Sequence, residues 1–225
     1  MKITYLGQAG FLLEVDGKKV LIDPYLSDSV AKVQPQNYRR IAVDTRFLAI
    51  KPDIIICTHN HHDHLDIETL KHYIKKDSAI TCLVPVSGWY ELRKFGGNNN
   101  YIMFNTGTEW TEGTVRFKAV KAEHSDEHAI GVIVYAEGKA FYFTGDTLYN
   151  ENVLHSVSNE DLEAVFLPVN GKGNNMNFAD AKRFALETKA KKVVPIHIGL
   201  FDELTADYWA CPNKVLPIIY EEICL

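Results

Sequence analysis

The segment from Thr58 to Asp66 carries the densest group of metal-ligating side chains in this sequence. It reads T-H-N-H-H-D-H-L-D and holds four of the nine histidines of the chain. Neutral imidazole is a common ligand of zinc-like ions, and carboxylates complete such sites. Because composition alone rarely gathers so many imidazoles after an apolar run, the segment predicts a metal site rather than an ordinary polar loop.

The spacing within this segment separates the candidate ligands into two pairs. His59 and His61 are two residues apart, so their side chains point the same way in extended backbone. Asp63 and His64 follow where the chain turns into a predicted helix. His62 falls between ligand positions and is expected to point away. The two pairs are therefore expected to face two neighbouring points.

The apolar run 54–57 before this segment indicates a short buried strand, because it is β-branched and bounded by Pro52 and Asp53. The pattern H-x-H-x-D-H after such a strand resembles the metallo-β-lactamase superfamily of metal-dependent hydrolases. Three later motifs follow in the order of that family: His124, then Thr144-Gly145-Asp146-Thr147, then Pro195-Ile196-His197.

The resemblance implies a site for two divalent metal ions. One ion is expected among His59, His61 and His124. The other is expected among Asp63, His64 and His197, with Asp146 bridging the two. Zinc or manganese is the expected metal, with iron as an alternative, because affinity order alone does not decide which metal a protein holds in the cell.

The chemistry of such a site follows from two cations that share a water molecule. They lower the pKa of that water toward neutrality and present hydroxide to an electrophile, so no serine or cysteine nucleophile is needed. Asp63 and Asp146 are the expected catalytic carboxylates. With ordinary ionisation states the pocket carries a charge of roughly +1, which favours a small anionic substrate such as a phosphate ester or a carboxylate.

The run 167–177, L-P-V-N-G-K-G-N-N-M-N, is the most informative candidate for substrate binding. Its glycines permit close approach of the backbone, and Asn170, Lys172 and Asn175 are the candidate substrate contacts. The alternative is a flexible connection before a helix. Together with Ile22-Asp23-Pro24 and 195–199, this run resembles the L-ascorbate-6-phosphate lactonase-like branch, which implies a phosphorylated lactone, ester or phosphodiester as the substrate.

Three features of the sequence each allow more than one interpretation. Asp23 is either a plain turn carboxylate or a group that orients a metal ligand. Residues 25–52 form either a solvated loop or a cover over the site that supplies Lys32, Arg39, Arg40 and Arg46 to an anionic substrate. His128 lies near His124, and a structural role is preferred to a substrate contact.

Three other functions are weighed against this hydrolase. A thioesterase of the glyoxalase II kind is the main alternative, although little chain remains after His197 for the helical addition that such enzymes usually carry. A di-iron oxidoreductase is disfavoured, because those relatives place a carboxylate where this chain has His61 and attach a flavin domain. A catalytically silent metal-binding protein is disfavoured by the complete ligand set.

The remaining sequence supplies the elements that position these side chains. Strands are indicated at 2–6, 11–15, 19–22, 54–57, 80–84, 101–104, 114–120, 130–135, 140–144, 164–169 and 193–196. Helices are predicted from about Asp66 to Lys76, from a Ser87 cap to Phe95, and from an Asn177 cap to about Lys189. The tail 201–225 is expected to hold a further helix and to pack on the body.

This mixed pattern indicates the α+β class and one domain over residues 1–225. The resemblance implies the metallo-β-lactamase-type αββα sandwich, in which two mixed sheets lie face to face with helices outside.

Composition limits the partners and the cellular location that are expected for this domain. The net charge of −5 offers no basic face, so nucleic acid is not an expected partner. No run approaches the roughly 20 apolar residues of a membrane helix. The four cysteines show no paired spacing, and the apolar runs around Cys57 and Cys82 favour buried thiols at these two positions. A cytoplasmic location is expected, since nothing in the sequence indicates export. Tyr208, Trp209 and the apolar tail leave a homo-oligomer open.

Overall fold

The computed structural model describes residues 1–225, which form two six-stranded sheets. The first sheet has the order β1 (Lys2–Gly7), β2 (Gly10–Val15), β3 (Lys18–Ile22), β4 (Ile54–Ile56), β5 (Thr81–Val84) and β6 (Asn100–Met103). The second has the order β12 (Lys192–Ile196), β11 (Leu162–Pro168), β10 (Lys139–Phe143), β9 (Ile130–Ala136), β8 (Val115–Lys121) and β7 (Glu109–Glu112). Both sheets contain parallel and antiparallel pairs, as predicted.

The largest core lies between the two sheets. Alternation places Val115, Phe117 and Ala119 of β8 in it, as expected for one face of a strand. Phe11 of the first sheet meets Phe143 and Phe166 of the second at ring-centroid distances of 4.9 and 5.1 Å, edge to face. Each buried phenylalanine contributes about 1.5–3 kcal/mol relative to exposure.

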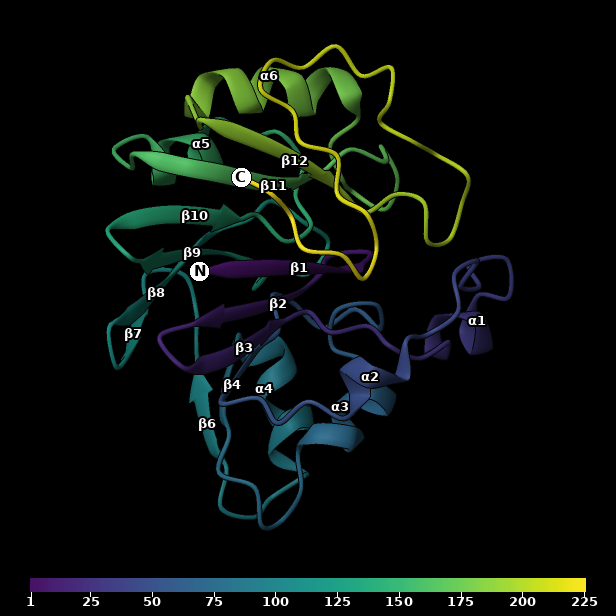
Figure 1. Cartoon of the computed structure of the whole chain (residues 1–225), viewed down its shortest axis with the longest axis vertical. Helices are drawn as coiled ribbons and strands as arrows, with labels where there is room; N and C mark the ends of the chain where they lie inside the picture. Colours follow the sequence, from purple (N-terminus) through teal and green to yellow (C-terminus); the bar gives the residue numbers. More distant parts are fainter.

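Helices cover the outer faces of both sheets (Figure 1). The first sheet is covered by α3 (Ile67–Tyr73) and α4 (Val86–Arg93), and the second by α5 (Glu151–Val157) and α6 (Phe178–Thr188). As predicted, the Asn177 side chain caps α6 by accepting hydrogen bonds from the backbone N–H groups of Ala179 and Asp180. The αββα sandwich is therefore confirmed.

Several predicted boundaries are wrong for local reasons. α3 is capped by Asp66 but ends at Tyr73, three residues before Lys76, since Ile74 is already extended. α4 begins at Val86 after Pro85, and the Ser87 hydroxyl donates to Asp126 instead of capping the helix. The strand β7 and the helix α5 were not predicted, and residues 25–52 contain the short helices α1 (Ser29–Val33) and α2 (Thr45–Leu48).

The predicted helix in the tail 201–225 is also wrong, because this segment holds no helix. Pro212 and Pro217 interrupt it, and a proline lacks the N–H that a helix interior requires. The tail packs on the body as expected, through Ile219 and Ile223 at the core between the sheets. No helix of the structure has the length and apolar character needed to cross a bilayer.

Candidate metal centre

The sequence-predicted ligands lie together at one edge of the sandwich. β8, β10 and β12 run in the same direction within the second sheet, so their carboxyl ends share that edge. His124, Asp146 and His197 follow these three strands, and the His59–His64 segment follows β4 of the first sheet. The fold thus gathers side chains that are up to 138 positions apart in the chain (197 − 59).

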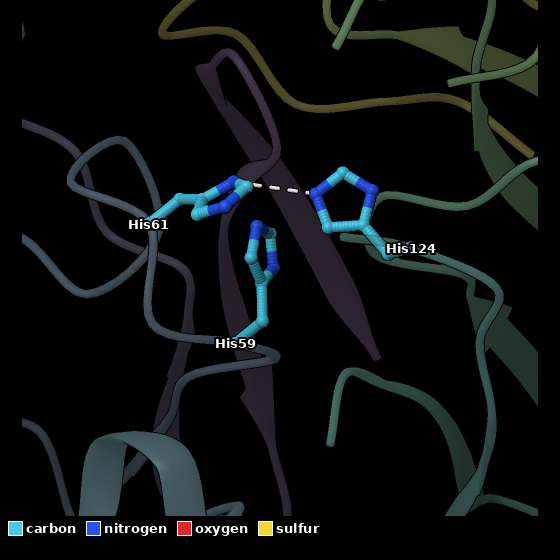
Figure 2. A group of neighbouring side chains, drawn as sticks. All are labelled: His59, His61 and His124. Atoms are coloured by element: carbon cyan, nitrogen blue, oxygen red, sulfur yellow. Dashed lines mark hydrogen bonds between the residues drawn. The ribbon is translucent and has the colours of Figure 1, made fainter. Parts of the chain in front are cut away.

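The first group consists of His59, His61 and His124 (Figure 2). The three ring centroids lie 4.5 to 4.9 Å apart. His124 Nε2 lies 3.2 Å from His61 Nδ1, while His124 Nδ1 lies 3.2 Å from the carbonyl oxygen of Asn174. A histidine held in this way through one nitrogen keeps the other free for a metal.

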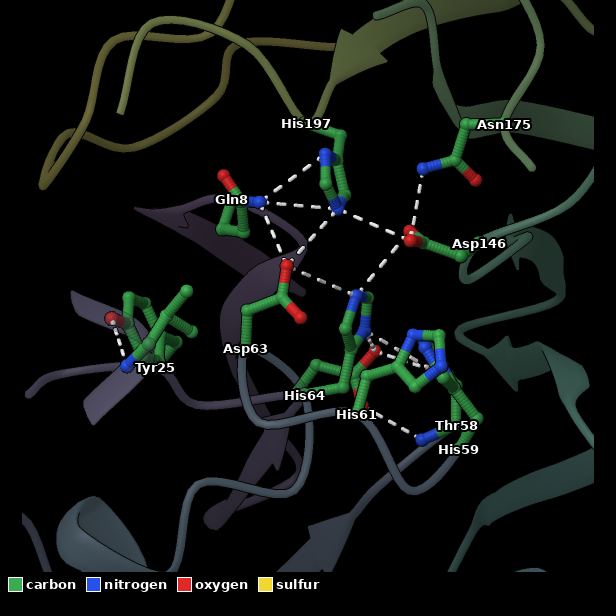
Figure 3. Close-up of polar contacts among 12 residues, drawn as sticks. Gln8, Tyr25, Thr58, His59, His61, Asp63, His64, Asp146, Asn175 and His197 are labelled. Atoms are coloured by element: carbon green, nitrogen blue, oxygen red, sulfur yellow. Dashed lines mark hydrogen bonds and ion pairs between the residues drawn. The ribbon is translucent and has the colours of Figure 1, made fainter. Parts of the chain in front are cut away.

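The second group consists of Asp63, His64 and His197 (Figure 3). Asp63 Oδ2 lies 3.3 Å from His197 Nε2 and 3.8 Å from His64 Nε2. The division of the six residues into these two groups is the one that the resemblance implied. Their roles as metal ligands remain predictions.

Asp146 lies between the two groups. Its Oδ1 is 3.3 Å from His64 Nε2, and its Oδ2 is 3.2 Å from His197 Nε2 and 3.9 Å from His124 Nε2. The preceding Gly145 has a φ of +60°, and a Cβ there would lie 2.9 Å from the carbonyl oxygen of Ile130. Only glycine fits this turn without strain, which explains the T-G-D run.

Burial and neighbouring charges shift the pKa values of the clustered side chains in opposite directions. Burial alone lowers the pKa of His64 and His197, but Asp146 and Asp63 outweigh it and raise the pKa of His197 to about 10. The pKa of His64 is raised well above its ordinary value, with Asp23 contributing. The pKa of His59 is lowered well below its ordinary value by burial and by His64. The imidazoles of His64 and His197 and the carboxylates of Asp63 and Asp146 thus favour one another's charged forms, which lowers the pKa of both carboxyl groups although burial opposes it.

The arrangement of buried polar atoms in this structure fits a bound metal ion. His59 Nε2 is a buried polar atom without a hydrogen-bond partner, and the buried atoms His64 Nε2 and Asp146 Oδ1, which also lack one, face each other at 3.3 Å. These three residues also offer ligand atoms that lie within 4.8 Å of one another. Since buried polar atoms are nearly always paired, an inward-facing set of imidazole and carboxylate atoms is accounted for by a cation.

Asp23 orients a predicted ligand. Its Oδ2 lies 2.7 Å from His64 Nδ1, and its Oδ1 accepts a hydrogen bond of 2.7 Å from the backbone N–H of Thr58. The side chain is fully buried. Of the two sequence interpretations, the orienting group is the one that agrees with this geometry.

The loop 170–177, which follows β11 of the second sheet, contacts two of the predicted ligands. Asn170 Nδ2 lies 3.0 Å from His197 Nδ1, and Asn175 Nδ2 donates to Asp146 Oδ2 at 2.9 Å. Lys172 is 72% exposed and forms an ion pair of 3.6 Å with Asp202. Both asparagine amides thus contact predicted ligands, and their expected role in substrate binding stays a prediction.

Sequence reasoning missed two residues that touch this site. Gln8, in the turn between β1 and β2, contacts Asp63 and His197. Asp126 accepts hydrogen bonds from the Asn60 backbone N–H and the Ser87 hydroxyl, and so ties the His59–His64 segment to α4. The only signals were the glycines around Gln8 and the position of Asp126 near His124, neither of which indicates a contact.

A cavity of about 620 Å³ opens onto the cluster. Its lining includes His61, Asp63, Asp146 and His197, and it is otherwise rich in amides: Gln8, Gln34, Asn37, Asn60, Asn170, Asn174 and Asn175. Among lysine and arginine side chains, Lys172 alone lines it.

The segment 25–52 reaches this cavity through Val30, Val33, Gln34 and Asn37. The four cations named above do not line the cavity. Lys32 pairs with Glu68, Arg40 with Glu203 and Arg46 with Asp44, while Arg39 donates a hydrogen bond to the Tyr220 hydroxyl. The segment thus covers part of the cavity, as one interpretation expected, but with apolar and amide side chains in place of these cations.

The other histidines lie outside the three ligand groups. His62 is exposed at the cavity lining, and His72 and His155 are exposed on α3 and α5. His128 is exposed, and its backbone N–H donates to Asp126.

A sandwich of two mixed sheets with histidines and aspartates at one edge defines a metal-dependent hydrolase of the metallo-β-lactamase fold. A model of the β-lactamase superfamily domain matches residues 2–197, and a UPF0173 metal-dependent hydrolase of Geobacillus sp. (strain WCH70) is 30% identical over 92% of this chain and 89% of its own. The chain belongs to the β-lactamase superfamily and, within it, to the UPF0173 metal-dependent hydrolase family.

Solved structures agree on the fold. A possible metal-dependent hydrolase from Veillonella parvula covers 100% of this chain and 99% of its own with a TM-score of 0.81 and 16% identity. The metallo-β-lactamase fold protein YhfI from Bacillus subtilis has the same coverage, a TM-score of 0.74 and 18% identity.

Proposed function

We propose that this enzyme hydrolyses a small anionic ester, lactone or phosphodiester at a centre for two divalent cations. The observation that carries the proposal is the convergence of imidazole and carboxylate atoms, with His59 Nε2 buried and unpaired, beside a cavity of about 620 Å³. A cavity of that volume suits a small molecule rather than a polymer.

The predicted ligands would hold the cations as two groups joined by Asp146. His59, His61 and His124 would hold one, and Asp63, His64 and His197 would hold the other. Zinc or manganese suits this donor set. When bound, such a pair supplies Lewis acidity and lowers the pKa of water enough to provide a nucleophile near neutral pH.

The residues of the chain prepare that chemistry by orientation and burial. Asp23 fixes the ring of His64 through Nδ1, and the Asn174 carbonyl does the same for His124. Asp146 is 4% exposed, so water reaches it only from the cavity side. Fixed ligands in a partly dry site need little reorganisation during the reaction.

The cavity wall favours a substrate with a compact anionic group and several hydroxyl or carbonyl groups. Lys172 is paired with Asp202, which also lines the cavity, so the anionic group would be met chiefly by the bound cations, while the amides of Gln34, Asn37 and Asn170 both donate and accept hydrogen bonds. This composition agrees with the phosphorylated lactone that the lactonase-like resemblance implies. It disagrees with a polyphosphate, which would need more cations.

The test is hydrolysis by metal-loaded enzyme of phosphorylated lactones, cyclic nucleotides and glutathione thioesters. We expect turnover of a lactone or phosphodiester, and a preference for glutathione thioesters would favour the alternative thioesterase. His61→Ala is expected to lower kcat/KM by at least about 100-fold, since loss even of an outer partner of a metal ligand costs 10–100-fold. His72→Ala, an exposed change on α3, is the matched control. Full activity of His61→Ala would contradict the proposal.

A further inference from the structure

Gln8 is held against the predicted centre by an unusual backbone. Its φ is +56°, a left-handed backbone conformation that residues other than glycine rarely adopt. The Gln8 carbonyl oxygen accepts hydrogen bonds from the His197 backbone N–H at 2.8 Å and from the Tyr5 hydroxyl at 3.0 Å. The residue is 2% exposed. Strain of this kind at a buried polar residue is typical of functional positions.

The Gln8 amide lies among the ligand atoms of the second group (Figure 3). Its Nε2 is 2.9 Å from Asp63 Oδ2 and lies against the ring of His197, 3.1 Å from Nε2 and 3.2 Å from Nδ1. Asp63 Oδ2 and His197 Nε2 are the same two atoms that approach each other at 3.3 Å in that group. Gln8 Nε2 therefore borders the point that the second group encloses.

Beside a cation the N–H end of the Gln8 amide is repelled, whereas its carbonyl oxygen is attracted. A half turn about the Cγ–Cδ bond exchanges Nε2 and Oε1 while the backbone stays in place. No other hydrogen bond holds the Gln8 side chain, because Oε1 has no protein partner.

We propose that Gln8 is a further ligand of the second cation, bound through Oε1 beside Asp63, His64 and His197. This inference rests on the proposed metal centre. A neutral amide oxygen is a hard donor that suits manganese better than zinc. The second position is therefore expected to prefer Mn²⁺ more strongly than the position formed by His59, His61 and His124.

The experiment is a titration of metal-free full-length protein with Mn²⁺ and with Zn²⁺. Binding is measured by calorimetry and, for Mn²⁺, also by electron paramagnetic resonance. Wild-type protein is expected to bind two cations. Gln8→Met, which keeps the length but removes the polar end, is expected to leave the first affinity unchanged and to weaken the second by at least about 10-fold. Gln8→Glu is expected to bind the second cation at least as tightly as wild type. Gln34→Met, at a cavity-lining amide outside the ligand groups, is the matched control.

The outcomes separate this inference from the proposed centre. Wild-type affinities for both cations in Gln8→Met would overturn it. So would a weaker second site in Gln8→Glu, which also carries the test if Gln8→Met fails to fold. Wild-type protein that binds no cation would overturn the centre and the inference together, whereas an effect confined to the second cation in Gln8→Met supports both.

Discussion

The ring of His64 is oriented by Asp23, which contacts the ring nitrogen that faces away from the other predicted ligands. The Asp23 carboxylate at 2.7 Å from Nδ1 fixes the ring and the tautomer, so that Nε2 faces Asp63 and Asp146. The same carboxylate holds the backbone N–H and the hydroxyl of Thr58, at the point where β4 leads into the histidine segment. One buried side chain thus positions both a predicted ligand and the strand end that carries it.

Asp23→Asn is expected to weaken cation binding by about 10- to 100-fold, because the amide lacks the charge that supports the His64 ring. Asparagine tolerates the left-handed backbone of position 23, whose φ is +43°, so the fold is expected to survive. Calorimetric metal titration checks this. Asp77→Asn, on an exposed turn, is the control, and equal affinities in the two variants would contradict the role of Asp23.

The residue types and spacing of the segment Thr58–Asp66 were enough to predict which of its side chains gather in the cluster. Gln8 and Asp126 act through tertiary contacts that no interval in the sequence encodes. Asn170 and Asn175 were predicted as substrate contacts, which stays a prediction, and the sequence did not indicate that their amide nitrogens also contact His197 and Asp146. A sequence pattern can therefore indicate which residues gather while leaving open which partner each one meets.

At the scale of elements, long apolar strands were predictable and weakly patterned segments were not. β8 alternates clearly, whereas β7 is a short strand of exposed and half-buried residues at the sheet edge. The tail was expected to hold a helix, but it packs Ile219 and Ile223 on the core from turns and irregular backbone. Propensity gives way to tertiary packing in such segments.

The tail offers a matched pair of adjacent residues for testing its packing. Trp209 is 7% exposed and donates a hydrogen bond of 2.8 Å to the carbonyl of Phe178, at the start of α6. Trp209→Ala is expected to lower the free energy of unfolding by about 3–5 kcal/mol. Tyr208→Ala is expected to change it by less than about 0.5 kcal/mol, since Tyr208 is 98% exposed. Urea unfolding of both variants checks this, and similar midpoints would contradict it.

A pH-dependent contribution comes from Glu160, which lies before β11. Burial alone raises its pKa, but hydrogen bonds from Lys118 and Tyr135 outweigh burial and lower it. A lowered pKa in the folded state gives stability that is present above the unfolded pKa and is lost as the pH falls through the folded value. Glu160→Gln is expected to cost up to about 1 kcal/mol at pH 7.

That difference is expected to vanish at a pH below the folded pKa of Glu160. Urea midpoints of the wild type and of Glu160→Gln, measured at pH 7 and at a series of lower pH values that spans the titration of Glu160, provide the check. A difference that persists unchanged in acid would contradict the account.

At the scale of the whole molecule, the two sheets bring the two halves of the chain to one centre. The first half contributes His59, His61, Asp63 and His64, and the second contributes His124, Asp146 and His197. Periodicity indicated only a mixed α and β chain. The sandwich was predictable through the family resemblance, because the pairing of two sheets depends on contacts between distant residues.

The most direct test of the central claim is anomalous X-ray diffraction from crystals of the full chain loaded with Mn²⁺ or Zn²⁺. The account predicts two anomalous peaks: one among His59, His61 and His124, and one among Asp63, His64 and His197, with Asp146 between them. A single peak, or peaks remote from these side chains, would contradict it.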